Sequence, residues 1–204
     1  MQPHWDRVYA AKKPDQVSWF RPHLETSLAL IERATRGDLA SSIIDVGGGA
    51  STLMDDLLLR GYRNLTVLDI SQAALDTARE RLGPNANRVR WLRADITQAD
   101  LEEQAFDVWH DRAVFHFLVN EWDRRAYMQA LERAMKPGGN VVIATFGPQG
   151  PTKCSGLETV RYGAESLQVE MGERLELLES FLEAHTTPSG LPQQFLYALF
   201  RVRK

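Results

Sequence analysis

The sequence predicts an α/β fold in which a doubly wound, seven-stranded sheet is mostly parallel and ends in an antiparallel hairpin. Short apolar runs alternate with helix-length segments as far as residue 146, which is typical of a parallel sheet with helices on both faces. Two longer strand-like segments follow, Leu175–Ala184 and Phe195–Arg203. The link between them is too short for a crossover helix, so we expect them to pair antiparallel.

The individual elements follow from apolar periodicity and from the residues that break it. The other expected strands are Ile43–Val46, Leu65–Asp69, Val89–Leu92, Phe106–His110 and Val141–Phe146. The expected helices are 24–36, 51–60, 71–82 with Ser71 as its N-cap, 122–135 and 164–171. Residues 1–23, which are rich in aromatic side chains, and residues 147–156 should be irregular.

Composition narrows the class of protein. A chain of 204 residues suits one domain, 1–204, in which residues 1–36 form an N-terminal helical or lid appendage. The net charge of -3 argues against a nucleic-acid partner. No apolar run reaches the roughly 18–20 residues of a membrane span, and the first residues lack the layout of a signal peptide. We therefore expect a soluble, cytoplasmic protein with no membrane partner; the sequence indicates no oligomeric state.

The stretch from Ile43 to Ser51 reads Ile-Ile-Asp-Val-Gly-Gly-Gly-Ala-Ser. This pattern is typical of a buried strand that ends in a glycine-rich turn, after which a helix begins. Glycine accepts unusual backbone angles and lets a ligand approach closely, and the helix that follows presents free N–H groups. Asp69 ends the next expected strand, and Asp95 follows the third. Together they predict a pocket for an adenosine-bearing cofactor.

Several motifs in order resemble those of the class I S-adenosylmethionine-dependent methyltransferases, a Rossmann-like family. The resemblance covers residues 40–203 and is carried by Asp45–Gly49, Leu68–Ser71, Ala94–Ile96, Phe106–Arg112 and Met135–Gly139. The terminal hairpin fits the family independently, because the family places an antiparallel strand inside its sheet. The resemblance implies that S-adenosyl-L-methionine is the cofactor.

The resemblance also implies a role for each motif residue. The glycines would pass beneath the methionine part of the cofactor, Asp69 would accept from its ribose hydroxyls, and Asp95 with the N–H of Ile96 would meet the adenine edge. Alternatively, Asp45 braces its turn, Asp69 is a surface turn residue, and Asp95 forms an Asx turn. The full set of expected cofactor-binding residues is Asp45, Gly47, Gly48, Gly49, Asp69, Ile70, Asp95, Ile96 and His110.

The fourth expected strand ends in the candidate catalytic residues, since ligands of open α/β sheets lie at the carboxyl ends of the strands. A sulfonium methyl group is already activated, so a general base is needed only if the acceptor carries a proton. His110, Asp111 and His116 are the candidates, although both histidines have a structural alternative. Arg112 either binds an anionic substrate or the cofactor carboxylate, or it pairs with Asp111 or Glu121.

The N-terminal aromatic side chains are candidates for a lid over the substrate. Trp19 and Phe20 fit that role because their surroundings resemble a loop, whereas Trp5 and Tyr9 are either lid residues or an outer helix face. Aromatic rings suit a site that holds a methylsulfonium and excludes water.

The loop after the fifth strand is the remaining candidate substrate-binding segment. Its Lys153 and Cys154 are expected to border the substrate. Methyl transfer needs no enzyme nucleophile, so Cys154 should line the pocket rather than react. It is the single cysteine, which excludes an intrachain disulfide, and no Cys/His cluster with metal-ligand spacing predicts a metal site.

The function predicted from these residues is methyl transfer to a small-molecule acceptor. The short Trp-Asp-Arg-Val-Tyr stretch near the start loosely resembles bacterial thiol and tellurite methyltransferases. The alternatives are a protein lysine methyltransferase, a noncatalytic cofactor-binding homologue, and a nicotinamide-dependent oxidoreductase. The last is disfavoured because Gly-Gly-Gly-Ala-Ser does not reproduce the Gly-x-Gly-x-x-Gly pattern.

Overall fold

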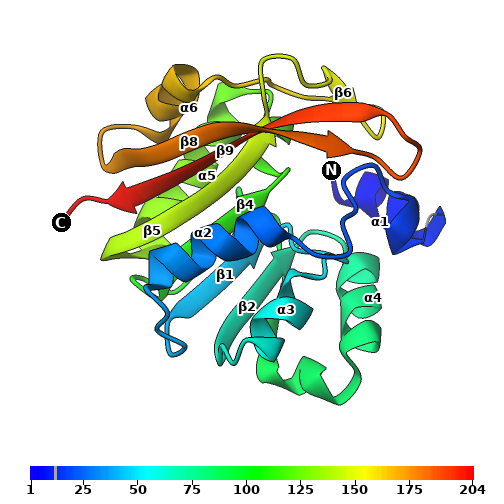
Figure 1. Ribbon diagram of the computed structural model, residues 1–204, viewed down its shortest axis with the longest axis horizontal. Helices are drawn as coiled ribbons and strands as arrows, with labels where there is room; N and C mark the ends of the chain where they lie inside the picture. Colours follow the sequence, from blue (N-terminus) through cyan, green and yellow to red (C-terminus); the bar gives the residue numbers. More distant parts are fainter. Residues whose placement is uncertain (12) are drawn as a thin grey trace.

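The computed structural model describes residues 1–11 and 13–204 and confirms the predicted fold. Its main sheet has the strand order β3-β2-β1-β4-β5-β9-β8 (Figure 1). Strands β1 to β5 are parallel, and β9 runs antiparallel to both of its neighbours. The bounds are β1 Ser42–Val46, β2 Asn64–Asp69, β3 Val89–Arg93, β4 Phe106–Arg112, β5 Met135–Phe146, β8 Leu175–Thr186 and β9 Pro192–Val202.

Helices cover both faces of this sheet. One apolar layer joins it to α2 (Glu25–Thr35), α3 (Leu53–Leu59) and α4 (Gln72–Leu82), and α2 and α3 are in front of the sheet in Figure 1. The other layer joins it to α5 (Glu121–Ala134) and α6 (Ala164–Met171). Successive strand residues face opposite layers, as Ile43 and Ile44 do, which explains the continuously apolar strands.

Three segments differ from the sequence expectation. Residues expected to be irregular contain α1 (Gln2–Ala11) and the 3-10 turn η1 (Pro14–Gln16). No α1 residue is fully buried, and a helix that buries so little needs only a weak apolar stripe in its sequence. The sequence pattern therefore did not indicate this helix. The loop after β5 contains a two-stranded ribbon, β6 (Lys153–Cys154) and β7 (Leu157–Glu158). Helix α3 begins two residues after Ser51, and the remaining short helices are η2 (Gly83–Arg88) and η3 (Phe115–Phe117).

In the part of the chain that the structure describes, none of the helices has the length and apolar character needed to cross a bilayer.

Helix α2 stabilises the fold through its buried face, where the Ile31 side chain has no exposed surface. We expect Ile31→Ala to lower the free energy of unfolding by about 2–5 kcal/mol, because it leaves a cavity in a packed layer. Urea denaturation followed by circular dichroism measures this change. Leu59→Ala is the control, since Leu59 is 86% exposed and its truncation should change stability by less than about 0.5 kcal/mol. Equal losses in the two variants would contradict the assignment of α2 to the core.

Candidate active site

A cavity opens at the carboxyl ends of the central parallel strands. It holds about 1130 Å³ of space, the part open to solvent included. The strand ends contribute Asp45 and Val46, Leu68–Ile70, Ala94–Ile96, and His110 with Arg112. This is where open α/β sheets bind ligands.

The glycine turn wraps closely around two carboxylates. A Cβ on Gly48 would lie 2.4 Å from Asp45 Oδ2, and one on Gly49 would lie 2.7 Å from Asp69 Oδ2. Gly47 has a φ of +68°, which favours glycine, and its N–H donates to the Leu68 carbonyl at 2.7 Å. Gly47 and Gly48 line the cavity, whereas Gly49 is outside the lining and faces Asp69.

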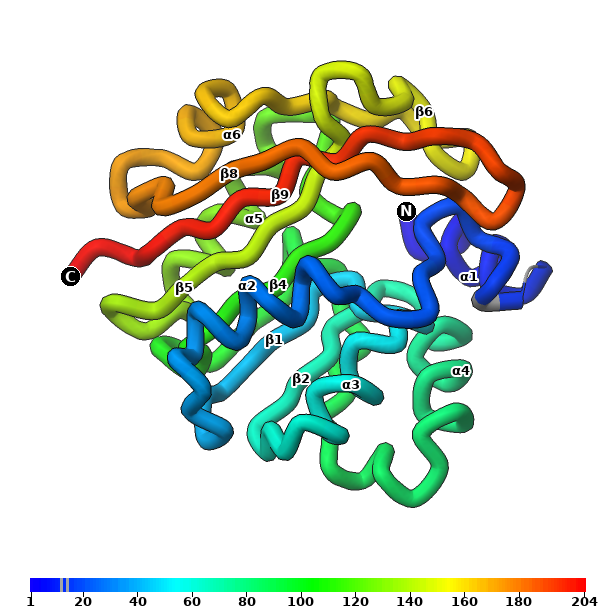
Figure 2. Tube along the Cα trace, in the orientation of Figure 1, coloured from blue at the N-terminus to red at the C-terminus, as the bar shows by residue number. Residues whose placement is uncertain are grey.

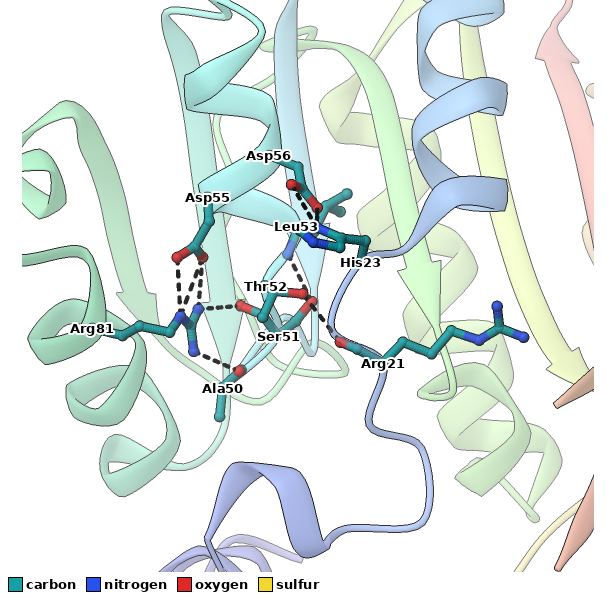
Figure 3. A network of polar contacts seen from close by, with 9 residues as sticks. All are labelled: Arg21, His23, Ala50, Ser51, Thr52, Leu53, Asp55, Asp56 and Arg81. Atoms are coloured by element: carbon teal, nitrogen blue, oxygen red, sulfur yellow. Dashed lines mark hydrogen bonds and ion pairs between the residues drawn. The ribbon is translucent and has the colours of Figure 1, made fainter. Parts of the chain in front are cut away.

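The end of the turn is fixed by groups from two other segments (Figure 3). Arg81 of α4 donates to the carbonyls of Ala50 at 2.9 Å and Ser51 at 2.5 Å. The Thr52 hydroxyl donates to the Arg21 carbonyl at 3.2 Å, which ties the turn to the segment before α2. The turn is therefore held by side chains as well as by its own backbone.

Beneath the turn, a buried chain of hydrogen bonds connects β1, β4 and α2. Asp45 Oδ1 lies 2.7 Å from His110 Nδ1, and His110 Nε2 lies 2.9 Å from Ser27 Oγ. His110 lines the cavity but is only 1% exposed, and both of its ring nitrogens are engaged. This geometry favours a positioning role for His110 over the expected role of general base.

Asp69 and the adjacent Ile70 lie at the end of β2 in the cavity wall. Asp69 Oδ1 accepts from the Ser71 N–H at 2.8 Å, and the Ser71 side chain caps α4 by accepting from the Ala74 N–H. Burial raises the pKa of Asp69 to about 7, and the nearby Asp45 carboxylate adds to the shift. A buried carboxylate of this kind fits a ligand that donates hydroxyl groups to it.

Asp95 and Ile96, which follow β3, also line the cavity. Asp95 Oδ1 accepts from the Thr97 N–H at 3.0 Å and from its hydroxyl at 2.7 Å. This is the Asx turn that the sequence left open as an alternative. The turn occupies one carboxylate oxygen and sets the carboxylate at the cavity edge.

The N-terminal segment covers the cavity with aromatic side chains. Trp5 and Tyr9 share one face of α1 at a spacing of four residues, and both line the cavity, as do Met1, Trp19 and Phe20. Trp5 and Trp19 meet edge to face with ring centroids 5.7 Å apart. The sequence left two hypotheses open for Trp5 and Tyr9, a lid or an outer helix face. In the structure both residues lie on a helix, and that helix face lines the cavity.

The N-terminal segment is attached to the sheet domain at two places. In the middle of α1 the Ser71 hydroxyl donates to Asp6 Oδ1 at 2.7 Å, which lowers the pKa of Asp6. Beyond α1, Arg21 pairs with Glu183 Oε1 at 2.7 Å and its Nε donates to His185 Nδ1 at 3.2 Å. Figure 2 shows this segment passing beside the tip of the β8–β9 hairpin.

Two expected catalytic residues have structural partners instead. Asp111 accepts from the backbone N–H groups of Val114 and Phe115 and from the Tyr127 hydroxyl, and burial raises its pKa to about 6. His116 stacks on Phe146, and burial lowers its pKa to about 3. Neither lines the cavity. A catalytic role for Asp111 and His116 stays a prediction that this geometry does not favour, because Asp111 faces away from His110 along β4 and orders the segment that follows it.

Arg112 lines the cavity, as expected of a substrate-binding residue, but it forms no ion pair with any described residue. Its Nη1 donates to the Trp19 carbonyl at 2.8 Å and its Nε to the Tyr197 hydroxyl at 3.0 Å. Of its two expected acidic partners, Asp111 faces the other side of the sheet and Glu121 pairs with Arg125.

The two candidates in the loop after β5 are outside the cavity lining. Lys153 is exposed and lies in β6 opposite Glu158 of β7. Cys154 is buried beneath the N-terminal segment, with its Sγ 3.6 Å from Ser18 Oγ. Substrate contact by these two residues stays a prediction that this geometry does not favour, because Cys154 packs against Ser18 of the N-terminal segment instead.

Sequence reasoning missed several residues of the site, and three of them have contacts or positions that matter here. Ser27 extends the buried chain from His110, and Arg21 and Phe117 line the cavity. No local signal marks Ser27, because it lies one turn into an ordinary amphipathic helix. Among the described residues, no group of three or more His, Cys, Asp or Glu side chains is arranged to hold a metal ion.

Comparison with known proteins finds a family model that matches the centre of the chain. The sequence profile of the methyltransferase domain matches residues 43–139. The chain is 29% identical over 129 residues to malonyl-[acyl-carrier protein] O-methyltransferase of Paenibacillus sp. (strain JDR-2), which is 61% of this chain and 46% of that protein. It therefore spans about half the length of that relative.

Solved structures extend the similarity to the whole chain. N-methyltransferase NodS from Bradyrhizobium japonicum, in complex with S-adenosyl-L-homocysteine, has a TM-score of 0.75 at 20% identity, covering 100% of this chain and 99% of that one. A second is Burkholderia thailandensis 1,6-didemethyltoxoflavin-N1-methyltransferase with its substrate and S-adenosylhomocysteine. Its TM-score is 0.71 at 18% identity, covering 89% of this chain and 78% of that one.

Residues 43–139 therefore match the methyltransferase domain in sequence, and the chain as a whole shares the fold of methyltransferases of known structure.

The buried carboxylates predict how stability depends on pH. The pKa of Asp69 rises from 3.8 to about 7 and that of Asp111 to about 6, so the folded state binds these protons more tightly than the unfolded state. Their stabilising contribution is complete below about pH 4 and is lost as the pH rises to about 7. We expect Asp69→Asn to remove up to about 1.4 kcal/mol per pH unit of this dependence between pH 5 and 7.

Urea unfolding of the ligand-free protein at pH 5, 6, 7 and 8 measures that slope. Asp100→Asn is the control, because the Asp100 side chain is 86% exposed. If wild type and Asp69→Asn lose stability with pH at the same rate, Asp69 is not the titrating group.

Proposed function

We propose that this protein transfers the methyl group of S-adenosylmethionine to a small-molecule acceptor. The Gly47–Gly48 turn would hold the methionine part of the cofactor, Asp69 its ribose hydroxyls, and Asp95 with the Ile96 N–H its adenine edge, with Ile70 against the ring. The acceptor would lie at the other end of the cavity, near Trp19, Phe20 and Arg112. Gly49, outside the cavity lining, would support this arrangement by packing on Asp69, and His110, in the cavity wall, by its hydrogen bond to Asp45.

The observation that carries the proposal is the aromatic roof. Helix α1 and the Trp19–Arg21 segment contribute Trp5, Tyr9, Trp19 and Phe20 to the cavity lining, so aromatic side chains cover part of the cavity. Such a cover excludes water from the reacting atoms. A cavity of this kind suits a small molecule better than the surface of a folded protein.

The chemistry needs little beyond alignment. S-adenosylmethionine supplies a methyl group on a positively charged sulfur, and the protein positions a nucleophile in line with it. The aromatic side chains of Trp5, Tyr9 and Trp19 can pack against that positive charge. Because both nitrogens of His110 are engaged, this arrangement suits an acceptor that is already nucleophilic at the working pH.

Two experiments test the proposal. Isothermal titration should show sub-millimolar binding of S-adenosylmethionine and S-adenosylhomocysteine. A release assay for S-adenosylhomocysteine against thiols, amines, phenols, carboxylates and metalloid anions should then identify the acceptor class. Failure of both cofactor forms to bind would overturn the proposal.

The competing hypothesis is a protein lysine methyltransferase. Incubation of a cell lysate with the protein and methyl-labelled cofactor, followed by separation into protein and small-molecule fractions, distinguishes the two. Label in the small-molecule fraction supports our proposal, and label confined to one protein band supports the competitor. Binding of cofactor without any label transfer would indicate a noncatalytic homologue. We also propose that the chain acts as one domain in the cytoplasm.

Asp69 provides the sharpest test of the cofactor position. Asp69→Ala should weaken binding of S-adenosylhomocysteine by about 1.5–3 kcal/mol, the scale for hydrogen bonds to a charged group. Titration calorimetry at pH 8, where the carboxylate is ionised, measures the change. Asp76→Ala, an exposed change on the same helix that Ser71 caps, should leave the affinity within twofold. Unchanged affinity in Asp69→Ala would show that the ribose lies elsewhere.

A further inference from the structure

We propose that the acceptor carries a carboxylate and that the Arg112 guanidinium binds it. The inference rests on the proposed function and names the substrate class for the same cavity. It follows from the Arg112 guanidinium in the cavity wall. Among the described residues this group has no carboxylate partner, and its Nη2 has no hydrogen-bond partner.

The Arg112 guanidinium has two neutral partners and one unsatisfied nitrogen. Its Nε and Nη1 donate to the Tyr197 hydroxyl and the Trp19 carbonyl, and its Cζ lies 4.7 Å from the centroid of the Phe195 ring. Its Nη2 is buried and has no hydrogen-bond partner among the described residues. A buried N–H donor of a charged group is destabilising without an acceptor, so this nitrogen indicates a ligand that supplies one.

The acidic side chains near Arg112 are already engaged. Asp111 is on the opposite face of β4 and accepts three hydrogen bonds there. Glu183 accepts from Arg21 through one oxygen and from the Thr26 hydroxyl through the other. The positive charge of Arg112 is therefore not neutralised by any described carboxylate.

A second unsatisfied donor lies beside the same Phe195 ring. His116 Nδ1 accepts from the Phe146 N–H at 3.0 Å, so the proton of the neutral ring is on Nε2. Burial and the Arg112 charge keep the pKa of His116 low, at about 3, so the ring is neutral. His116 Nε2 is buried without a partner among the described residues, and its ring centroid is 6.4 Å from that of Phe195.

A carboxylate satisfies the requirement of Arg112, which lines the cavity, whereas His116 does not line it. It is planar, accepts several hydrogen bonds, and forms strong charge-assisted bonds with guanidinium. Arg112 lies at the end of β4 beside the N-terminal roof, whereas the ribose-binding candidate Asp69 lies at the end of β2. We assign the carboxylate to the acceptor because Arg112 donates to the Trp19 carbonyl of the N-terminal roof. S-adenosylmethionine also carries a carboxylate, and the test below distinguishes these two sources.

The test uses simple carboxylates as probes on the full chain saturated with S-adenosylhomocysteine. Benzoate, phenylacetate and hexanoate are compared with their amides by titration calorimetry. We expect at least one acid to bind roughly 10- to 100-fold more tightly than its amide. Arg112→Met should abolish this preference and Arg112→Lys should retain part of it. Arg174→Met is the control, because it removes one exposed positive charge that pairs with Glu132 on the surface.

Each result supports or overturns the proposal. Equal binding of every acid and amide by the wild type overturns it, whether or not the variants fold. A loss of S-adenosylhomocysteine affinity in Arg112→Met, with the acid preference unchanged, assigns Arg112 to the cofactor carboxylate and also overturns it. If Arg112→Met does not fold, a full acid preference in Arg112→Lys counts against Arg112. Failure of the wild type to bind S-adenosylhomocysteine is separate, since it refutes the proposed function itself.

Discussion

The site depends on the buried hydrogen bond between Asp45 and His110. It joins the ends of β1 and β4, and Ser27 extends it to α2, so three elements converge under the glycine turn. The turn packs so closely on the Asp45 carboxylate that a side chain on Gly48 would overlap it. The Asp45 carboxylate therefore fixes the path of the glycine turn. The turn then places Gly49 against Asp69. A shift of His110 would move both walls of the cavity.

Most of the sheet could be predicted from the sequence because its strands are buried on both faces. Runs such as Ile43–Val46 are continuously apolar, and glycine or proline ends them, so both length and boundaries are visible. Helix α1 could not be predicted in this way, because it packs with a narrow aromatic face and buries no residue fully. Its stability comes from contacts with distant segments, which local periodicity does not reveal.

Site residues could be predicted where a motif fixes their place at the end of a strand. They were harder to predict where the direction of the side chain decides whether the residue reaches the cavity. Asp69 and Asp95 lie at strand ends, and both reach the cavity. His110 and Asp111 cannot share one site, because neighbouring residues of a strand point to opposite faces. That alternation is readable from the sequence and would have excluded Asp111. The engagement of Ser27 and the burial of Cys154 depend on tertiary packing, for which no sequence signal exists.

The two ends of the cavity come from different parts of the chain. Residues that match the methyltransferase profile, 43–139, supply the carboxylates and glycines at the end of the cavity proposed to bind the donor. The groups that surround Arg112 come from outside it, Trp19 from the N-terminal segment and Phe195 and Tyr197 from the last strand. Relatives can therefore share the central motifs and still recognise unrelated acceptors. Exchange of the terminal segments offers a route to new acceptor specificity that leaves the donor end intact.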